Sequence, residues 1–131
     1  MLATVTALYG ALTALLLIAL SFRVVKLRRN LGVGLGDGGN KDILHAMRLQ
    51  ANLAEYAPIS LLLLLFLELN LLTRLWLHVF GLIFLVARLL HVWGFGRRSG
   101  VSTGRVLGTL LTWLNIIAMA VTNAFLLLQT F

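Results

Sequence analysis

Four long apolar segments dominate the chain of 131 residues, and short charged or glycine-rich joints separate them. The first segment, Met1–Phe22, contains no charged residue and is long enough to cross the hydrocarbon core of a bilayer, which takes about 20 apolar residues. The pattern predicts an all-α integral membrane protein, a single four-helix transmembrane domain over residues 1–131. The expected helices lie at approximately 2–28, 41–67, 75–95 and 105–129. No basic residue precedes the first segment, so we expect a retained helix rather than a signal peptide.

Composition supports the membrane assignment. Hydrophobic residues make up 60% of the chain and charged residues 11%, and the mean hydropathy is +0.99. A soluble domain of this size could not hide that much apolar surface. The bilayer is therefore expected to be the solvent for most of the chain.

The net charge of +7 reports topology rather than nucleic-acid binding. Most basic residues cluster around the first and third joints, and Arg74 stands in the second. Basic residues concentrate in cytoplasmic joints, so we expect both chain termini on the opposite, non-cytoplasmic side. Compact joints and the lack of targeting signals favour a bacterial inner membrane. The clusters would also attract anionic lipid headgroups: Arg23, Lys26, Arg28, Arg29, Lys41 and Arg48 around the first joint, and Arg88, Arg97, Arg98 and Arg105 around the third.

Cysteine is absent, which excludes disulfides and a thiol nucleophile from the protein itself. Any sulfur chemistry would need a thiol supplied by a ligand. The three histidines, His45, His78 and His91, do not combine with a carboxylate at the spacing of a metal site. We predict no dedicated metal centre.

The first joint is rich in glycine, and residues 34–39 match the letters of a dinucleotide-binding motif. That motif has meaning only between a strand and a helix, whereas here it follows a membrane span. We therefore predict a flexible turn. Asn40 is expected to cap the second helix, and Asp42 to lie in its first turn, where a negative charge is favourable.

A row of polar residues lies inside the second apolar segment. Spacings of four and three residues place Arg48, Asn52 and Glu55 on one face of a helix, with His45 one turn earlier. Charged groups at membrane depth are costly, so they usually face a bundle interior or a wet cavity and serve a function. The row is thus a candidate binding site. An ion pair between Arg48 and Glu55 is an alternative explanation, but it leaves unexplained the polar residues clustered with them: His45, Gln50, Asn52 and Tyr56.

The third and fourth segments carry further polar groups. Arg88, His91 and Phe95 share one helical face, although Arg88 alone could instead extend toward the headgroups. Arg105 opens the fourth helix, with Thr109 and Thr112 further along its face. Because a helix start is unfavourable for a cation, Arg105 is expected to face something anionic.

The run Arg48–Pro58, RLQANLAEYAP, resembles the second-helix signature of the membrane-associated proteins in eicosanoid and glutathione metabolism, the MAPEG family. The run Gly81–His91, GLIFLVARLLH, resembles the third-helix counterpart. Four spans, the chain length and the basic end of the first helix also match. The resemblance implies a homotrimer that binds glutathione between neighbouring subunits near the cytoplasmic side.

The resemblance also implies roles for single residues. Arg105 matches the arginine that contacts the glutathione thiol and is the candidate catalytic residue. His91 stands where prostaglandin-synthesising members have histidine. A lipophilic substrate would enter from the bilayer, into a groove lined by the first and fourth helices. The residues that would hold the glutathione peptide are Arg48, Asn52, Glu55 and Tyr56, with Arg28, Gln50 and His91 as further contacts.

These residue types suit glutathione chemically. Its two carboxylates fit guanidinium groups, its ammonium fits Glu55, and an arginine near its thiol favours the nucleophilic thiolate. We therefore expect a glutathione transferase or peroxidase that acts on lipophilic electrophiles or lipid hydroperoxides. Phe95 and Val106 replace hydroxyl residues of the catalytic members, so a non-catalytic glutathione- or lipid-binding protein is an alternative. A small multidrug-proton exporter is another, but its essential glutamate would lie in the first span, where this chain has none.

Overall fold

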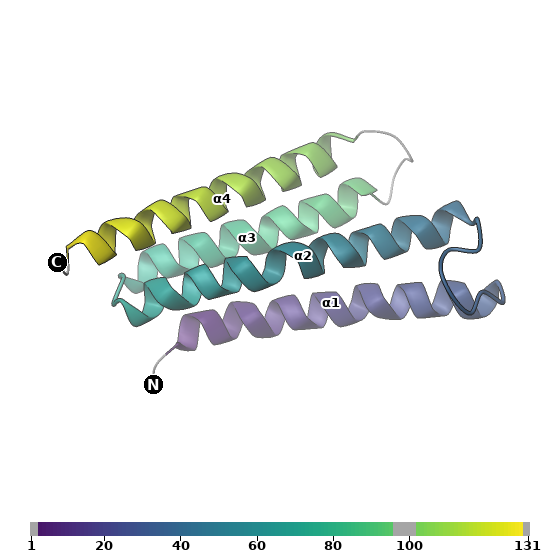
Figure 1. Ribbon diagram of the computed structural model, residues 1–131, viewed down its shortest axis with the longest axis horizontal. Coiled ribbons are helices and arrows are strands. Elements are labelled where there is room, and N and C mark those ends of the chain that lie inside the picture. The colour runs from purple at the N-terminus through teal and green to yellow at the C-terminus, as the bar shows by residue number, and fades with distance from the viewer. Residues whose placement is uncertain (1–2, 96–101, 130–131) are drawn as a thin grey trace.

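The computed structural model describes residues 3–95 and 102–129, and the regular structure within them is entirely helical. The helices run side by side along the long axis of the molecule (Figure 1). All four are long and apolar enough to cross a membrane, which confirms the predicted four-span helical bundle. Their bounds differ from the expected ones by at most two residues: α1 Thr4–Asn30, α2 Lys41–Leu69, α3 Arg74–Phe95 and α4 Thr103–Leu128.

The bundle has two distinct ends, seen at the left and right of Figure 1. The turn between α2 and α3 lies at the same end as the start of α1 and the end of α4, and we call this the terminal end. The connection between α1 and α2 lies at the opposite end, where α4 begins, and we call it the basic end.

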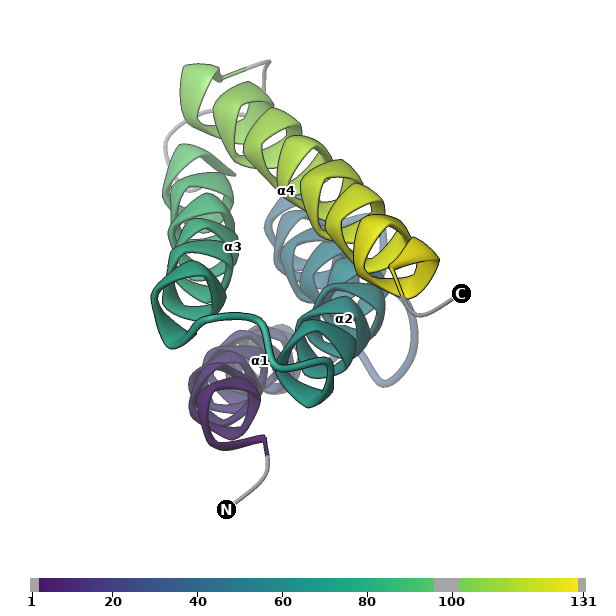
Figure 2. The same cartoon turned by 90° about the vertical axis from the view of Figure 1, so that its left-hand side faces the viewer.

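Helices α2 and α3 form the middle of the bundle. Helix α1 packs on both of them, α4 also packs on both, and the closest packing is between α3 and α4. Figure 2, viewed along the bundle, shows α1 and α4 on opposite sides of the α2–α3 pair. A site between α2, α3 and α4 of one chain therefore receives no contribution from α1.

The connection at the basic end forms a turn that caps α2. The Asn40 side chain accepts hydrogen bonds from the backbone N–H groups of Asp42 (2.9 Å) and Ile43 (3.2 Å), which confirms the predicted cap. Gly38 and Gly39 have φ values of 57° and 74°, a region that glycine occupies without strain. The glycines therefore serve the turn, as the sequence indicated.

The terminal end is held by a carboxylate that crosses from one helix to another. Helix α1 has no side-chain cap of its own, because Ala3 precedes it with φ 62°. Instead, Glu68 near the end of α2 accepts the backbone N–H groups of Val5 and Thr6, each at 2.7 Å. A negative charge also stabilises a helix start through the helix dipole. One side chain thus joins the start of α1 to the end of α2.

Candidate functional site

Arg88 is the centre of the polar interior. Its side chain is only 2% exposed, although it lies within a spanning helix. One guanidinium nitrogen, Nη1, donates to Asn52 Oδ1 of α2 at 2.6 Å. The other, Nη2, donates to the Gly108 carbonyl of α4 at 2.9 Å and to Thr112 Oγ1. The interpretation that Arg88 extends toward the headgroups is wrong, because its charge is held inside the bundle between three helices.

The groups around Arg88 are neutral. No acidic side chain in residues 3–95 and 102–129 forms an ion pair with it, and amide, carbonyl and hydroxyl oxygens take the place of a counter-ion. Its Cζ atom also lies 5.3 Å from the centroid of the Tyr56 ring, a cation–π distance. Tyr56 in turn accepts a hydrogen bond from Trp113 Nε1 at 2.8 Å. The positive charge therefore organises an α2–α3–α4 network and leaves no negative charge buried beside it.

Small residues on α4 make this contact possible. A Cβ atom added at Gly108 would lie 2.6 Å from the Ala87 carbonyl oxygen and 2.8 Å from the His91 nitrogen. One turn earlier, a Cβ atom at Gly104 would lie 2.9 Å from the Cα atom of Gly94. Small residues at one-turn intervals let membrane helices approach closely. The Gly108 carbonyl reaches Arg88 because the backbones of α3 and α4 lie in near contact.

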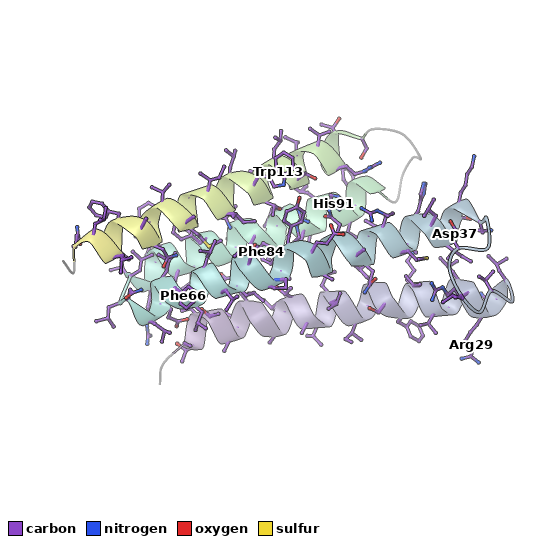
Figure 3. The ribbon with its side chains drawn as sticks, in the orientation of Figure 1. Arg29, Asp37, Phe66, Phe84, His91 and Trp113 are labelled. Atoms are coloured by element: carbon purple, nitrogen blue, oxygen red, sulfur yellow. The ribbon has the colours of Figure 1, made fainter. Side chains whose placement is uncertain are left out.

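A hollow of about 420 Å³ opens beside this network, toward the basic end. Figure 3 labels His91 of α3 and Trp113 of α4, which both line it. One part of the lining is polar and another is apolar, so the hollow suits a ligand that has both characters, and its volume is in the range of small-molecule sites. The polar lining consists of Asn52, His91, Arg105 and Thr109, and the apolar lining of Val106, Leu110 and Trp113.

The predicted site residues divide into two groups. Asn52, His91 and Arg105 line the hollow, and Tyr56 contacts Trp113 at its edge. Arg48 and Glu55 are exposed and form no ion pair with each other, so the alternative of an intramolecular pair has no support within one chain.

Helix geometry explains why the row on α2 divides. At 3.6 residues per turn, the polar residues of this row spread over about 100° around the helix axis. Glu55 and Arg48 lie at one edge of this sector, Asn52 in the middle, and Tyr56 at the other edge. Asn52 and the Tyr56 edge face α3 and α4, which leaves the charged edge pointing away from the bundle.

Two further predicted contacts lie away from the hollow. Arg28 donates from Nε to the Gly36 carbonyl at 3.0 Å and from Nη2 to Met47 Sδ at 3.5 Å, so it holds the α1–α2 connection against α2. Gln50 is half-buried and does not line the hollow. The side chain of Phe95 and residues Arg97 and Arg98 lie outside the part of the chain that is described.

The sequence reasoning did not assign Arg88, Thr112 and Trp113 to the site. Arg88 could have been found from its charge inside an apolar span that offers no acid on the same helical face. The spacing of Gly104, Gly108 and Thr112 was a second signal, because such small residues mark close helix packing. Trp113 gave no comparable signal, since aromatic residues are common on lipid-facing surfaces.

Fold and site together define an integral, multi-pass helical membrane protein that has a hollow of small-molecule size beside a buried arginine. The model of the MAPEG family matches residues 6–125, and the chain belongs to this family. It is similar to the inner membrane protein YecN of Escherichia coli strain K12, with 39% identity over 125 residues that cover 91% of this chain and 89% of YecN. YecN of E. coli O6:H1 strain CFT073 matches with the same identity and coverage. The family resemblance of the two helix motifs is thus confirmed.

Gly108→Ala tests the close packing of α3 and α4. The added methyl group must push the helices apart or strain them, and we expect a loss of about 1–3 kcal/mol of stability. Thermal unfolding in detergent, followed by circular dichroism, measures the change. Gly10→Ala on α1 is the matched control, because a Cβ atom there meets nothing within 4 Å. Equal stability of the two variants would contradict the packing described.

Proposed function

We propose that this protein is a glutathione-dependent membrane enzyme that conjugates lipophilic electrophiles or reduces lipid hydroperoxides. The observation that carries the proposal is the composition of the hollow, whose lining combines Arg105 and His91 with the apolar Leu110 and Trp113. A charged thiol peptide suits the polar lining, and an apolar second substrate suits the rest. Membership of the MAPEG family supports the same function.

Arg105 is proposed as the residue that stabilises the thiolate. A free thiol has a pKa near 8.5, and a neighbouring guanidinium lowers that pKa by favouring the anion. In conjugation, the thiolate sulfur bonds to the electrophilic carbon as the leaving group departs. In peroxide reduction, the thiolate attacks the terminal oxygen and the O–O bond breaks, giving an alcohol and glutathione sulfenic acid. A second glutathione then yields the disulfide and water.

The outward edge of α2 supports a proposal about assembly. Arg48 and Glu55 are exposed in the single chain, on a helix that also exposes Ile59, Leu62 and Phe66. Charges that face lipid inside a membrane are costly, so Arg48 and Glu55 need other polar or charged groups to shield them from lipid. We propose that neighbouring copies supply these groups in a homotrimer, where Arg48 binds a glutathione carboxylate and Glu55 binds its ammonium group. Gln50 and Arg28 are proposed as further contacts to glutathione at the same interface between copies.

We propose that this enzyme lies in a bacterial inner membrane. The similarity to YecN, named as an inner membrane protein, supports this location. The lipophilic substrate would then enter the hollow sideways from the bilayer, past the apolar side chains of Val106 and Leu110. The basic end would face the cytoplasm, where glutathione is available.

A non-catalytic binding protein of the same fold is the second candidate. The observation in its favour is Val106, which lines the hollow next to Arg105 with an apolar side chain. No hydroxyl at this position would assist formation of the thiolate. Binding of glutathione without turnover of any electrophile or hydroperoxide would identify this candidate. Membership of the MAPEG family does not favour the exporter alternative.

Arg105→Ala tests the catalytic role. With glutathione and a chromogenic aryl halide, we expect kcat/KM to fall by about 100-fold or more, because a preorganised positive group at the developing charge is lost. The pH at which the remaining rate rises should move upward, since the guanidinium no longer lowers the thiol pKa. Arg74→Ala, at the start of α3 and the opposite end of the bundle, is the matched control. An unchanged rate and pH profile in Arg105→Ala would refute this role.

Glu55→Gln tests the ammonium contact. A charged hydrogen bond is lost while the shape of the side chain is kept, so we expect glutathione to bind about 10-fold more weakly, as measured by titration calorimetry. The mass of the detergent-solubilised assembly should stay unchanged. Asp42→Asn removes a carboxylate from the first turn of the same helix and serves as control. Wild-type affinity in Glu55→Gln, or failure of that variant to assemble, would exclude the contact.

A further inference from the structure

The outer face of α1 is a continuous apolar surface without charge. Its large side chains recur every three or four residues, and several are more than half exposed: Leu15 at 68%, Ile18 at 66%, Phe22 at 67% and Val25 at 51%. Spacings of three and four place them on one side of the helix. This face differs from the outer edge of α2, which exposes Arg48 and Glu55. The α1 face can meet lipid hydrocarbon directly, without another chain to cover it.

This apolar face ends in a basic turn. Lys26 and Arg29 follow Phe22 at spacings of four and three, so they continue the same side of the helix. Figure 3 shows Arg29 pointing away from the bundle at the basic end. Both side chains are exposed, and neither forms an ion pair with an acidic side chain in the described residues. Asp37, the acid of the adjoining connection, accepts the backbone N–H of Gly39 at 3.0 Å.

Two hollows flank this turn. One, of about 370 Å³, is lined by Phe22, Val25, Lys26, Arg29 and Asn30. The other, of about 410 Å³, shares Val25 and Arg29 with the first and continues along the start of the connection to α2. Each hollow is therefore lined by both apolar and basic side chains. Neither shares a residue with the hollow between α2, α3 and α4.

We propose that this turn binds the phosphate headgroup of an anionic phospholipid. Lys26 and Arg29 hold the phosphate, and the Asn30 amide donates to an ester or phosphate oxygen. An acyl chain lies along the apolar face through Phe22, Ile18 and Leu15. The positive charges of Lys26 and Arg29 select an anionic over a zwitterionic headgroup. The apolar side chains that line the hollow select a lipid over a free phosphate ion. The groups that hold the headgroup, Lys26, Arg29 and Asn30, are not among those proposed to bind glutathione.

The test measures lipid retention by the intact protein. Native mass spectrometry of the detergent-solubilised full chain, with equal amounts of phosphatidylglycerol and phosphatidylcholine, gives the ratio of bound lipids. Each basic group near a membrane surface contributes about fivefold to anionic-lipid binding, so we expect at least a fivefold preference for phosphatidylglycerol. Lys26→Gln with Arg29→Gln should bring this ratio close to one. Lys26→Arg with Arg29→Lys, which keeps both charges, should retain it.

Controls separate a site from a general effect of charge. Lys41→Gln with Arg74→Gln removes the same number of charges away from both hollows and should leave the preference intact. Equal loss in this control and in the Lys26/Arg29 pair would overturn the proposal, as would an unchanged preference when Lys26 and Arg29 are neutralised. Glycerol 3-phosphate, which lacks acyl chains, should not displace the bound lipid at millimolar concentration. Displacement by this soluble phosphate would overturn the assignment to a lipid.

Discussion

The structure depends on one buried cation. Arg88 lies within a spanning helix, where an unpaired charge is costly, and it is solvated by the oxygen atoms of Asn52, Gly108 and Thr112 and by the ring of Tyr56. Each of these partners belongs to α2 or α4. The hydrogen bonds of the two terminal guanidinium nitrogens therefore fix how α2 and α4 lie against α3.

The remaining features of the site follow from this constraint. Helix α4 approaches α3 closely through glycine, which brings its first turns, with Arg105 and Val106, next to His91. Helix α2 turns its Tyr56 edge inward, so the edge with Arg48 and Glu55 faces out. Two surfaces of different character result. The charged edge of α2 is the surface that we propose another copy of the chain covers, and the apolar face of α1 is the surface that we propose contacts lipid.

Much of the fold could be predicted from the sequence, because hydropathy and caps are local properties. The four spans, the Asn40 cap and the glycine turn depend on residues within one segment. The family was also recognisable from two helix motifs. The division of the α2 row was not predictable, since periodicity shows that residues share a face but not which edge meets a neighbour. The place of Arg88 likewise depends on the partners supplied by two other helices.

A double-mutant cycle between Arg88 and Asn52 tests the central claim most directly. Arg88→Met and Asn52→Leu replace each partner with an apolar side chain of similar size, and unfolding free energies in mixed micelles give the coupling. If the guanidinium joins α2 to α3, the double variant should be less destabilised than the sum of the single variants by about 1–3 kcal/mol. Strictly additive effects would contradict the account.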